Sequence, residues 1–108
     1  DWEWSIMYGG TNHWTFTPTR TENAWMHIVY CVQGNNDSGH RLHQNGGSAL
    51  SANNRGGGHG GSAGNALGGN STGGEDWNGW MYNVRLFNKM LTQSEAAQLY
   101  ANDKPPGA

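Results

Sequence analysis

The chain has 108 residues, with 8 acidic residues, 6 Lys or Arg and a formal net charge of −2 at pH 7. This length corresponds to one domain or to part of one. The small net charge excludes disorder driven by charge repulsion, and six scattered basic residues form no stripe for nucleic acid. No apolar run approaches the roughly 20 residues that span a bilayer. We therefore expect neither nucleic-acid binding nor membrane insertion.

The first third of the chain has the alternation that is typical of strands. Bulky side chains alternate with smaller or polar ones over residues 2–8 and again over 13–17, and the Gly-Gly-Thr-Asn of 9–12 predicts a turn between them. Pro18 ends the second run. Residues 24–32 are apolar almost throughout, which predicts a central strand that is covered on both faces.

The middle of the chain is rich in turn formers. Residues 34–39 predict a polar loop and residues 40–44 a short strand, which Asn45-Gly46 should turn back as a hairpin. Ten of the twenty residues of 55–74 are Gly, a density that favours an excursion over the surface, with one brief strand near 65–67.

The end of the chain combines one more strand with a helix. Residues 77–87 alternate and predict a strand, and Thr92 with Glu95 has the spacing of a capping box. Asn102 can close the helix, and the two prolines that follow prevent its return. Many strands followed by one short helix near 93–101 predict an all-β fold, an antiparallel β-sandwich.

The composition predicts a core that depends on aromatic residues. Leu, Ile, Val and Phe number only 13, whereas there are 6 Trp and 4 Tyr, each of which can bury a large area. The single cysteine, Cys31, excludes an internal disulfide and a cysteine-based zinc site.

Six motifs of this sequence follow the order found in laminin-G-like, concanavalin A-like jelly-roll domains. Trp25-Met26-His27-Ile28-Val29 resembles the family's "W-x-H-[IV]-[AV]" strand, and Leu42-His43-Gln44-Asn45-Gly46 resembles its "L-Y-V-N-G" hairpin. Ala66-Leu67-Gly68 is similar to "L-x-I-G", and Trp77-Asn78-Gly79-Trp80-Met81 is similar to "F-x-G-x-I". The run 84–92 resembles "V-R-I-Y-N-R-A-L-S", and Glu95 with Leu99-Tyr100 resembles the "E-I…L-Y" helix.

This resemblance covers roughly residues 25–100 and implies a jelly-roll β-sandwich. Tyr82-Asn83 replaces an acidic pair that often precedes the last strand, so any contact made by that pair in relatives is in doubt here. The family's first strands have no counterpart upstream of Trp2. We expect residues 1–108 to form a single laminin-G-like domain, as a segment or an abbreviated form of a longer chain.

Two aromatic positions have competing interpretations. Trp25 and His27 could form a binding pair, but the resemblance favours a core Trp and a hydrogen-bonded His that orients a neighbouring loop. The resemblance also makes Trp77 a core residue, and it leaves Trp80 open.

The sequence offers no strong metal site. His40 and His43 are three residues apart, which on a strand directs them to opposite faces. The oxygen-rich clusters at 35–37 and at Glu75-Asp76 could hold Ca²⁺, although turn chemistry explains them as well. We expect no cofactor.

Catalysis is not expected, and no catalytic residue is assigned. Glycoside hydrolysis needs two closely placed carboxylates, but Glu75-Asp76 lies in a Gly-rich loop and Glu3, Glu22 and Glu95 are scattered. Cys31 lies within an apolar run, which is unlike the setting of a reactive thiol. The Gly-rich stretch lacks the Lys and the following helix of a phosphate loop.

We therefore expect a non-catalytic recognition or adhesion module that binds glycans or protein surfaces. The alternative is a structural appendage of a larger assembly, such as a virion or fibre, that contacts neighbouring subunits; a glycoside hydrolase remnant is disfavoured. The Gly- and Asn-rich, Lys-poor composition fits an extracellular, virion or cell-surface location.

A glycan site should combine exposed aromatic platforms with neutral loop residues that hydrogen-bond sugar hydroxyls. The residue types select Trp14 and Trp80 as platforms, with Asn53, Asn54, Arg55 and Asp76 as loop partners. The competing interpretation makes both tryptophans buried core and the loop residues turn formers.

Overall fold

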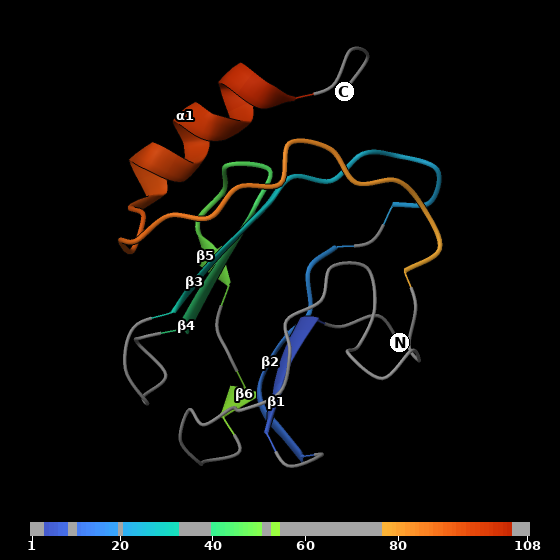
Figure 1. Ribbon diagram of the computed structural model, residues 1–108, viewed down its shortest axis with the longest axis vertical. Coiled ribbons are helices and arrows are strands. Elements are labelled where there is room, and N and C mark those ends of the chain that lie inside the picture. The colour runs from blue at the N-terminus through green and yellow to red at the C-terminus, as the bar shows by residue number, and fades with distance from the viewer. Residues whose placement is uncertain are drawn as a thin grey trace.

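The computed structural model describes residues 4–8, 11–19, 21–32, 40–50, 53–54 and 77–104. These residues contain six strands and one helix (Figure 1). The elements are β1 (Trp4–Tyr8), β2 (Thr11–Phe16), β3 (Ile28–Val32), β4 (His40–Gln44), β5 (Ala49–Leu50), β6 (Asn53–Asn54) and α1 (Gln93–Asp103).

The strands form two antiparallel sheets of three strands each. One has the order β1-β2-β6, and the other has the order β3-β4-β5. The register of β1 with β2 shifts between Ile6 and Met7, which is a β-bulge. The alternating runs at the start of the chain thus form the predicted hairpin strands, with β2 ending at Phe16 just before Pro18.

The two sheets meet at Phe16. Its side chain is fully buried together with Leu42 of β4, and Ile28, Tyr30 and Leu50 pack around them. The rings of Phe16 and Tyr30 meet edge to face, with their centroids 5.8 Å apart. This edge-to-face geometry is the favourable one for aromatic pairs. The described part therefore has two antiparallel sheets that share a core, as an all-β fold requires. Among the described side chains, Phe16 is the one buried aromatic residue, so the predicted dependence of the core on Trp and Tyr is not seen there.

The opposite face of the second sheet is covered by α1 and the residues before it. Val29 and Cys31, which alternate with Ile28 and Tyr30 along β3, are buried against Leu91 and Ala96. Figure 1 shows α1 lying over this sheet on the side away from β1 and β2. The prediction that residues 24–32 are covered on both faces is confirmed for residues 28–31 of β3, whereas Val32 is 48 % exposed. The central strand of the described sheet is β4, however, and β3 lies at its end.

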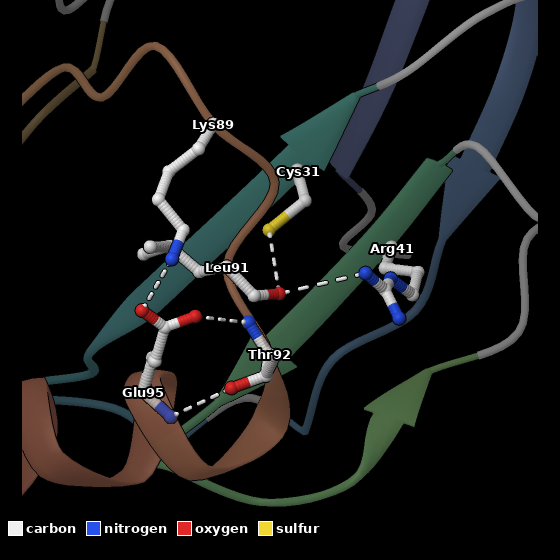
Figure 2. Close-up of polar contacts among 6 residues, drawn as sticks. All are labelled: Cys31, Arg41, Lys89, Leu91, Thr92 and Glu95. Carbon is white, nitrogen blue, oxygen red and sulfur yellow. Dashed lines mark hydrogen bonds and ion pairs between the residues drawn. The ribbon is translucent and has the colours of Figure 1, made fainter.

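The start of α1 is fixed by the predicted capping box (Figure 2). The Glu95 N–H donates to Thr92 Oγ1 at 3.2 Å, and the Thr92 N–H donates to Glu95 Oε1 at 3.1 Å. Just before this cap, the Leu91 carbonyl lies 3.7 Å from the Cys31 thiol and 3.5 Å from a guanidinium nitrogen of Arg41. The cap and these contacts fix the point at which the chain enters the helix. The helix ends at Asp103, two residues beyond the expected end and past Asn102.

The turn after β4 has the predicted left-handed geometry. Asn45 has a φ of 49° and Gly46 a φ of 71°, and the Gly47 N–H donates to the Gln44 carbonyl at 2.9 Å. Positive φ at both central positions is what a type I′ turn needs. Gly46 also lies against α1, because a Cβ built there would stand 2.9 Å from the Ala97 Cα. The hairpin turn and the helix therefore depend on each other.

Two side chains of this hairpin hold the segment that precedes β3. The Gln44 amide bonds both backbone groups of Thr19, at 2.8 Å and 2.5 Å. Asn45 accepts the His27 N–H through Oδ1 at 2.9 Å and donates its own N–H to the His27 carbonyl at 2.9 Å. Because β3 begins only at Ile28, residues 24–27 have no strand hydrogen bonds, and these contacts hold the segment instead.

The prediction of a strand over residues 77–87 is wrong. The structure places this segment as an extended run outside any strand. Asn83 has a φ of 51°, in the left-handed region, which no strand position adopts. The loops predicted at 34–39 and 55–74, the brief strand near 65–67 and the oxygen-rich clusters lie outside the described residues.

Candidate functional site

The segment 77–87 carries a row of exposed aromatic side chains. Trp80 is 85 % exposed, and Trp77, Tyr82 and Phe87 are each about half exposed. Aromatic rings left in water cost free energy that burial would recover, so such a group is a candidate binding surface. We call Trp77, Trp80 and Tyr82 together with Trp25 the aromatic surface.

Trp25 joins this surface from a distant part of the sequence. Its ring meets Tyr82 edge to face with centroids 6.1 Å apart, and it is 45 % exposed. Figure 1 shows the residues before β3 running close to the segment 77–90, as the ring contact requires. The core assignment of Trp25 is therefore wrong, because the chain around it lies outside the sheet. The core assignment of Trp77 is wrong as well, since 48 % of its surface is exposed.

Local geometry orients the tryptophan at the start of the segment. The indole of Trp77 folds over Gly79, where a Cβ would stand 3.0 Å from the Trp77 Nε1. Gly79 therefore leaves room for the ring of a neighbouring side chain in the same segment. Trp80 follows directly and is left in solvent.

Two ion pairs tie the segment to α1. Arg85 binds Asp103 with both terminal nitrogens, at 2.8 Å and 3.1 Å. Lys89 Nζ lies 2.7 Å from Glu95 Oε2 (Figure 2). A bidentate guanidinium–carboxylate pair fixes geometry better than a single contact. The ordered helix therefore serves as the anchor for a segment that has no strand partner.

His27 lies where these parts meet. Its ring is 5.6 Å from the Tyr100 ring of α1, and its buried Nδ1 has no hydrogen-bond partner. Burial lowers the pKa of His27, Asp103 raises it, and Arg85 lowers it, so the net shift is downward. The sequence predicted that the His27 side chain orients a neighbouring loop. The contact with the loop is made by the His27 backbone N–H, which donates to Asn45, and not by the imidazole.

His40 and His43 lie on opposite faces of β4, as their spacing predicts. His40 Nδ1 lies 2.7 Å from the Tyr30 hydroxyl, on the face toward Phe16. His43 Nδ1 lies 2.9 Å from the Gly47 carbonyl, and His43 is paired in register with Val29 on the helix side. Burial raises the pKa of Tyr30, so this phenol stays protonated. Both histidines act as internal hydrogen-bonding groups.

The described carboxylates do not suit glycoside hydrolysis. Hydrogen bonds from Lys89 and from the Thr92 backbone lower the pKa of Glu95, whereas a general acid needs a raised pKa. Asp103 is bound by Arg85, and Glu22 is exposed on a separate segment. Within the described residues, no three His, Cys, Asp or Glu side chains gather where a metal ion could sit. No helix in the same ranges has the length and apolar character that crossing a bilayer needs.

The structure brings only some of the predicted site residues together. Trp14 and Asn54 are register partners of β2 and β6, and Asn53 is the partner of Thr15. Trp80 lies on a different segment and has the exposure that a platform needs. Arg55 and Asp76 lie outside the described residues. Their role in binding stays a prediction, as does that of Trp14, Asn53 and Asn54.

Sequence reasoning missed Trp25 and Tyr82 as members of an exposed surface. The alternation of 77–87 gave no sign that the segment leaves the sheet. Asn83 was the available signal, since Asn adopts positive φ more readily than most residues.

One comparison with known proteins identifies the family of the chain. A laminin-G family model, described as the concanavalin A-like lectin/glucanases superfamily, matches residues 1–97. This confirms the resemblance found in the motifs and extends it upstream of residue 25. No curated protein and no solved structure matches the chain.

Proposed function

The chain belongs to the concanavalin A-like lectin/glucanases superfamily, and from this premise we propose that it is a non-catalytic recognition module that binds glycans through its aromatic surface. Laminin-G-like relatives are carbohydrate- or protein-binding modules, typically extracellular, which sets the class of ligand and the expected location. The proposal includes a single jelly-roll sandwich domain over residues 1–108.

The observation that carries the proposal is the 85 % exposure of Trp80, two residues before Tyr82, which forms a half-exposed pair with Trp25. A pyranose ring has an apolar C–H face that packs on an aromatic ring, and its hydroxyls need directional partners. Asn78 and Asn83 are exposed in the same segment and supply neutral amides. Shallow sites of this kind bind weakly as single copies and gain apparent affinity when several are linked.

A glycan array probed with the protein displayed in several copies tests the proposal. Loss of one stacked aromatic ring is worth about 1.4 kcal/mol, so Trp80→Ala should weaken binding about tenfold. Leu86→Ala is the matched control, because Leu86 is 97 % exposed in the same segment but cannot stack on a sugar. Circular dichroism should show both variants folded like the unmodified protein.

The second candidate is a structural appendage that contacts neighbouring protein subunits. It draws on the exposed aliphatic side chains of the same segment, Val84 at 52 % and Leu86 at 97 %. If Leu86→Ala weakens the interaction as much as Trp80→Ala does, this candidate replaces glycan binding. If the displayed protein binds no glycan at all, the appendage also stands ahead.

A glycoside hydrolase remnant makes a third, disfavoured candidate. Its test is amide substitution of the carboxylates. Glycan cleavage that disappears in Asp76→Asn or Glu75→Gln would establish an enzyme in place of a binding module.

A further inference from the structure

The cations of the aromatic segment are neutralised by the helix that covers the sheet. The segment 77–90 contains two basic residues, Arg85 and Lys89, and each is bound to a carboxylate of α1. The pairs are short, at 2.8 Å for Arg85 with Asp103 and 2.7 Å for Lys89 with Glu95. The Asp103 carboxylate uses two of the five N–H donors of Arg85 and offsets its positive charge, which weakens its attraction for an anionic ligand.

The remaining described cations lie in settings that do not add to the segment's charge. Arg41 is on β4, where one terminal nitrogen faces the Leu91 carbonyl. Lys104 follows α1 directly, as its C-cap residue. The whole chain carries a net charge of −2, which repels polyanions at long range. Among the described residues, the charges that accompany the aromatic surface therefore give little attraction for sulfate, uronate or sialate groups.

We infer that the aromatic surface selects uncharged glycans and that the Arg85–Asp103 pair is the element that withholds a cation from anionic ones. This inference rests on the proposed glycan binding and specifies its ligand class. Aromatic stacking recognises the C–H faces of neutral hexoses and N-acetylhexosamines, whereas an acidic sugar needs a free guanidinium or ammonium group. Binding should thus depend little on salt.

The test compares neutral glycans with uronate-bearing and sulfated glycans on one array at about 0.1 M and 1 M NaCl, where the screening length falls from ~10 Å to ~3 Å. The unmodified protein should bind neutral glycans with less than about a twofold change between the two salt concentrations. Trp80→Ala should lose this binding at both concentrations.

A gain-of-function variant tests the role of the ion pair. Asp103→Asn removes the carboxylate that neutralises Arg85 and raises the net charge of the chain by one, so this variant should gain binding to uronate-bearing glycans at low salt and lose it at high salt. The double variant Arg85→Gln with Asp103→Asn should not gain that binding, which controls for changes in the helix end. Circular dichroism monitors folding in each case.

The outcomes separate the inference from the proposal on which it rests. Preferential, salt-sensitive binding of acidic glycans by the unmodified protein, lost in Arg85→Gln, overturns the inference and leaves glycan recognition intact. An Asp103→Asn variant that stays folded and gains no anionic ligand overturns the role of the ion pair. Binding to no glycan of either class overturns the proposed function together with the inference.

Discussion

Replacing Gly46 with Ala should be among the most destabilising single-methyl changes in this chain. The Gly46 φ of 71° lies in the left-handed region, where an L side chain costs about 1–2 kcal/mol. The added Cβ would also stand 2.9 Å from the Ala97 Cα and 3.3 Å from the Tyr100 Cβ. Because the nearest atom belongs to the helix backbone, the turn or the whole of α1 must shift.

The magnitude follows from these two costs. Overpacking against a fixed neighbour adds about 1–3 kcal/mol, and the stiffer unfolded chain returns about 0.4–1 kcal/mol. The expected loss is therefore about 2–4 kcal/mol of unfolding free energy, a large share of the roughly 5–15 kcal/mol typical of a domain. Movement of α1 would also loosen Ala96 and Leu99 from Val29 and Cys31.

Chemical denaturation measures this loss directly. With a urea slope of about 1–3 kcal/mol per molar, the midpoint should fall by about 1 M or more. Ser48→Ala, an exposed change in the same hairpin, should stay within about 0.5 kcal/mol of the unmodified protein. Gly46→Asn tolerates the positive φ but keeps the clash, so it should remain clearly destabilised. A Gly46→Ala variant as stable as Ser48→Ala would refute the packing of the turn against α1.

Three further predictions follow from the described contacts. Thr92→Ala should cost about 1 kcal/mol of unfolding free energy in chemical denaturation because it removes the cap, whereas an unchanged midpoint would mean that the helix does not depend on it. Leu42→Ala should lower the unfolding free energy by about 2–5 kcal/mol, because Leu42 is fully buried. Trp25→Ala should lower it by only about 0.5–1.5 kcal/mol, because Trp25 is 45 % exposed, and equal losses for the two variants would contradict this placement. The pKa values of His27 and Glu95 are lowered in the folded chain, so the unfolded chain binds more protons as the pH falls. Stability should therefore decrease first below pH 6.5 and again below pH 4.5. In a series of melts from pH 8 to pH 3, His27→Gln should remove only the upper step.

Local sequence signals predicted the elements whose contacts are short in sequence. The Thr92–Glu95 box and the Asn45-Gly46 turn depend on neighbours within a few residues, and both are present. The predicted strand at 40–44 is present as well, and it pairs with β3 and, across the turn, with β5. The opposite faces of His40 and His43 follow from the period of a strand in the same way.

The errors concern residues whose environment is set by distant parts of the chain. Alternation over 77–87 describes which side chains could share a face, but a strand also needs a partner edge, which no local pattern supplies. The family resemblance assigned Trp25 to the core, but β3 begins only at Ile28 and Trp25 is 45 % exposed before it. Exposure of an aromatic residue is therefore the property that this sequence predicted least well.

The helix has two roles that its sequence combines along one short element. Ala96 and Leu99 cover β3, while Glu95 and Asp103 bind the cations of the aromatic segment. Because the capping box uses the same Glu95 carboxylate that binds Lys89, helix formation and charge neutralisation are coupled at one residue. Any change that unfolds α1 would both uncover Val29 and Cys31 and release Arg85 and Lys89 toward solvent. The neutral character proposed for the aromatic surface is thus a consequence of the folded helix, and the loss of the helix should convert the surface into one that attracts anions.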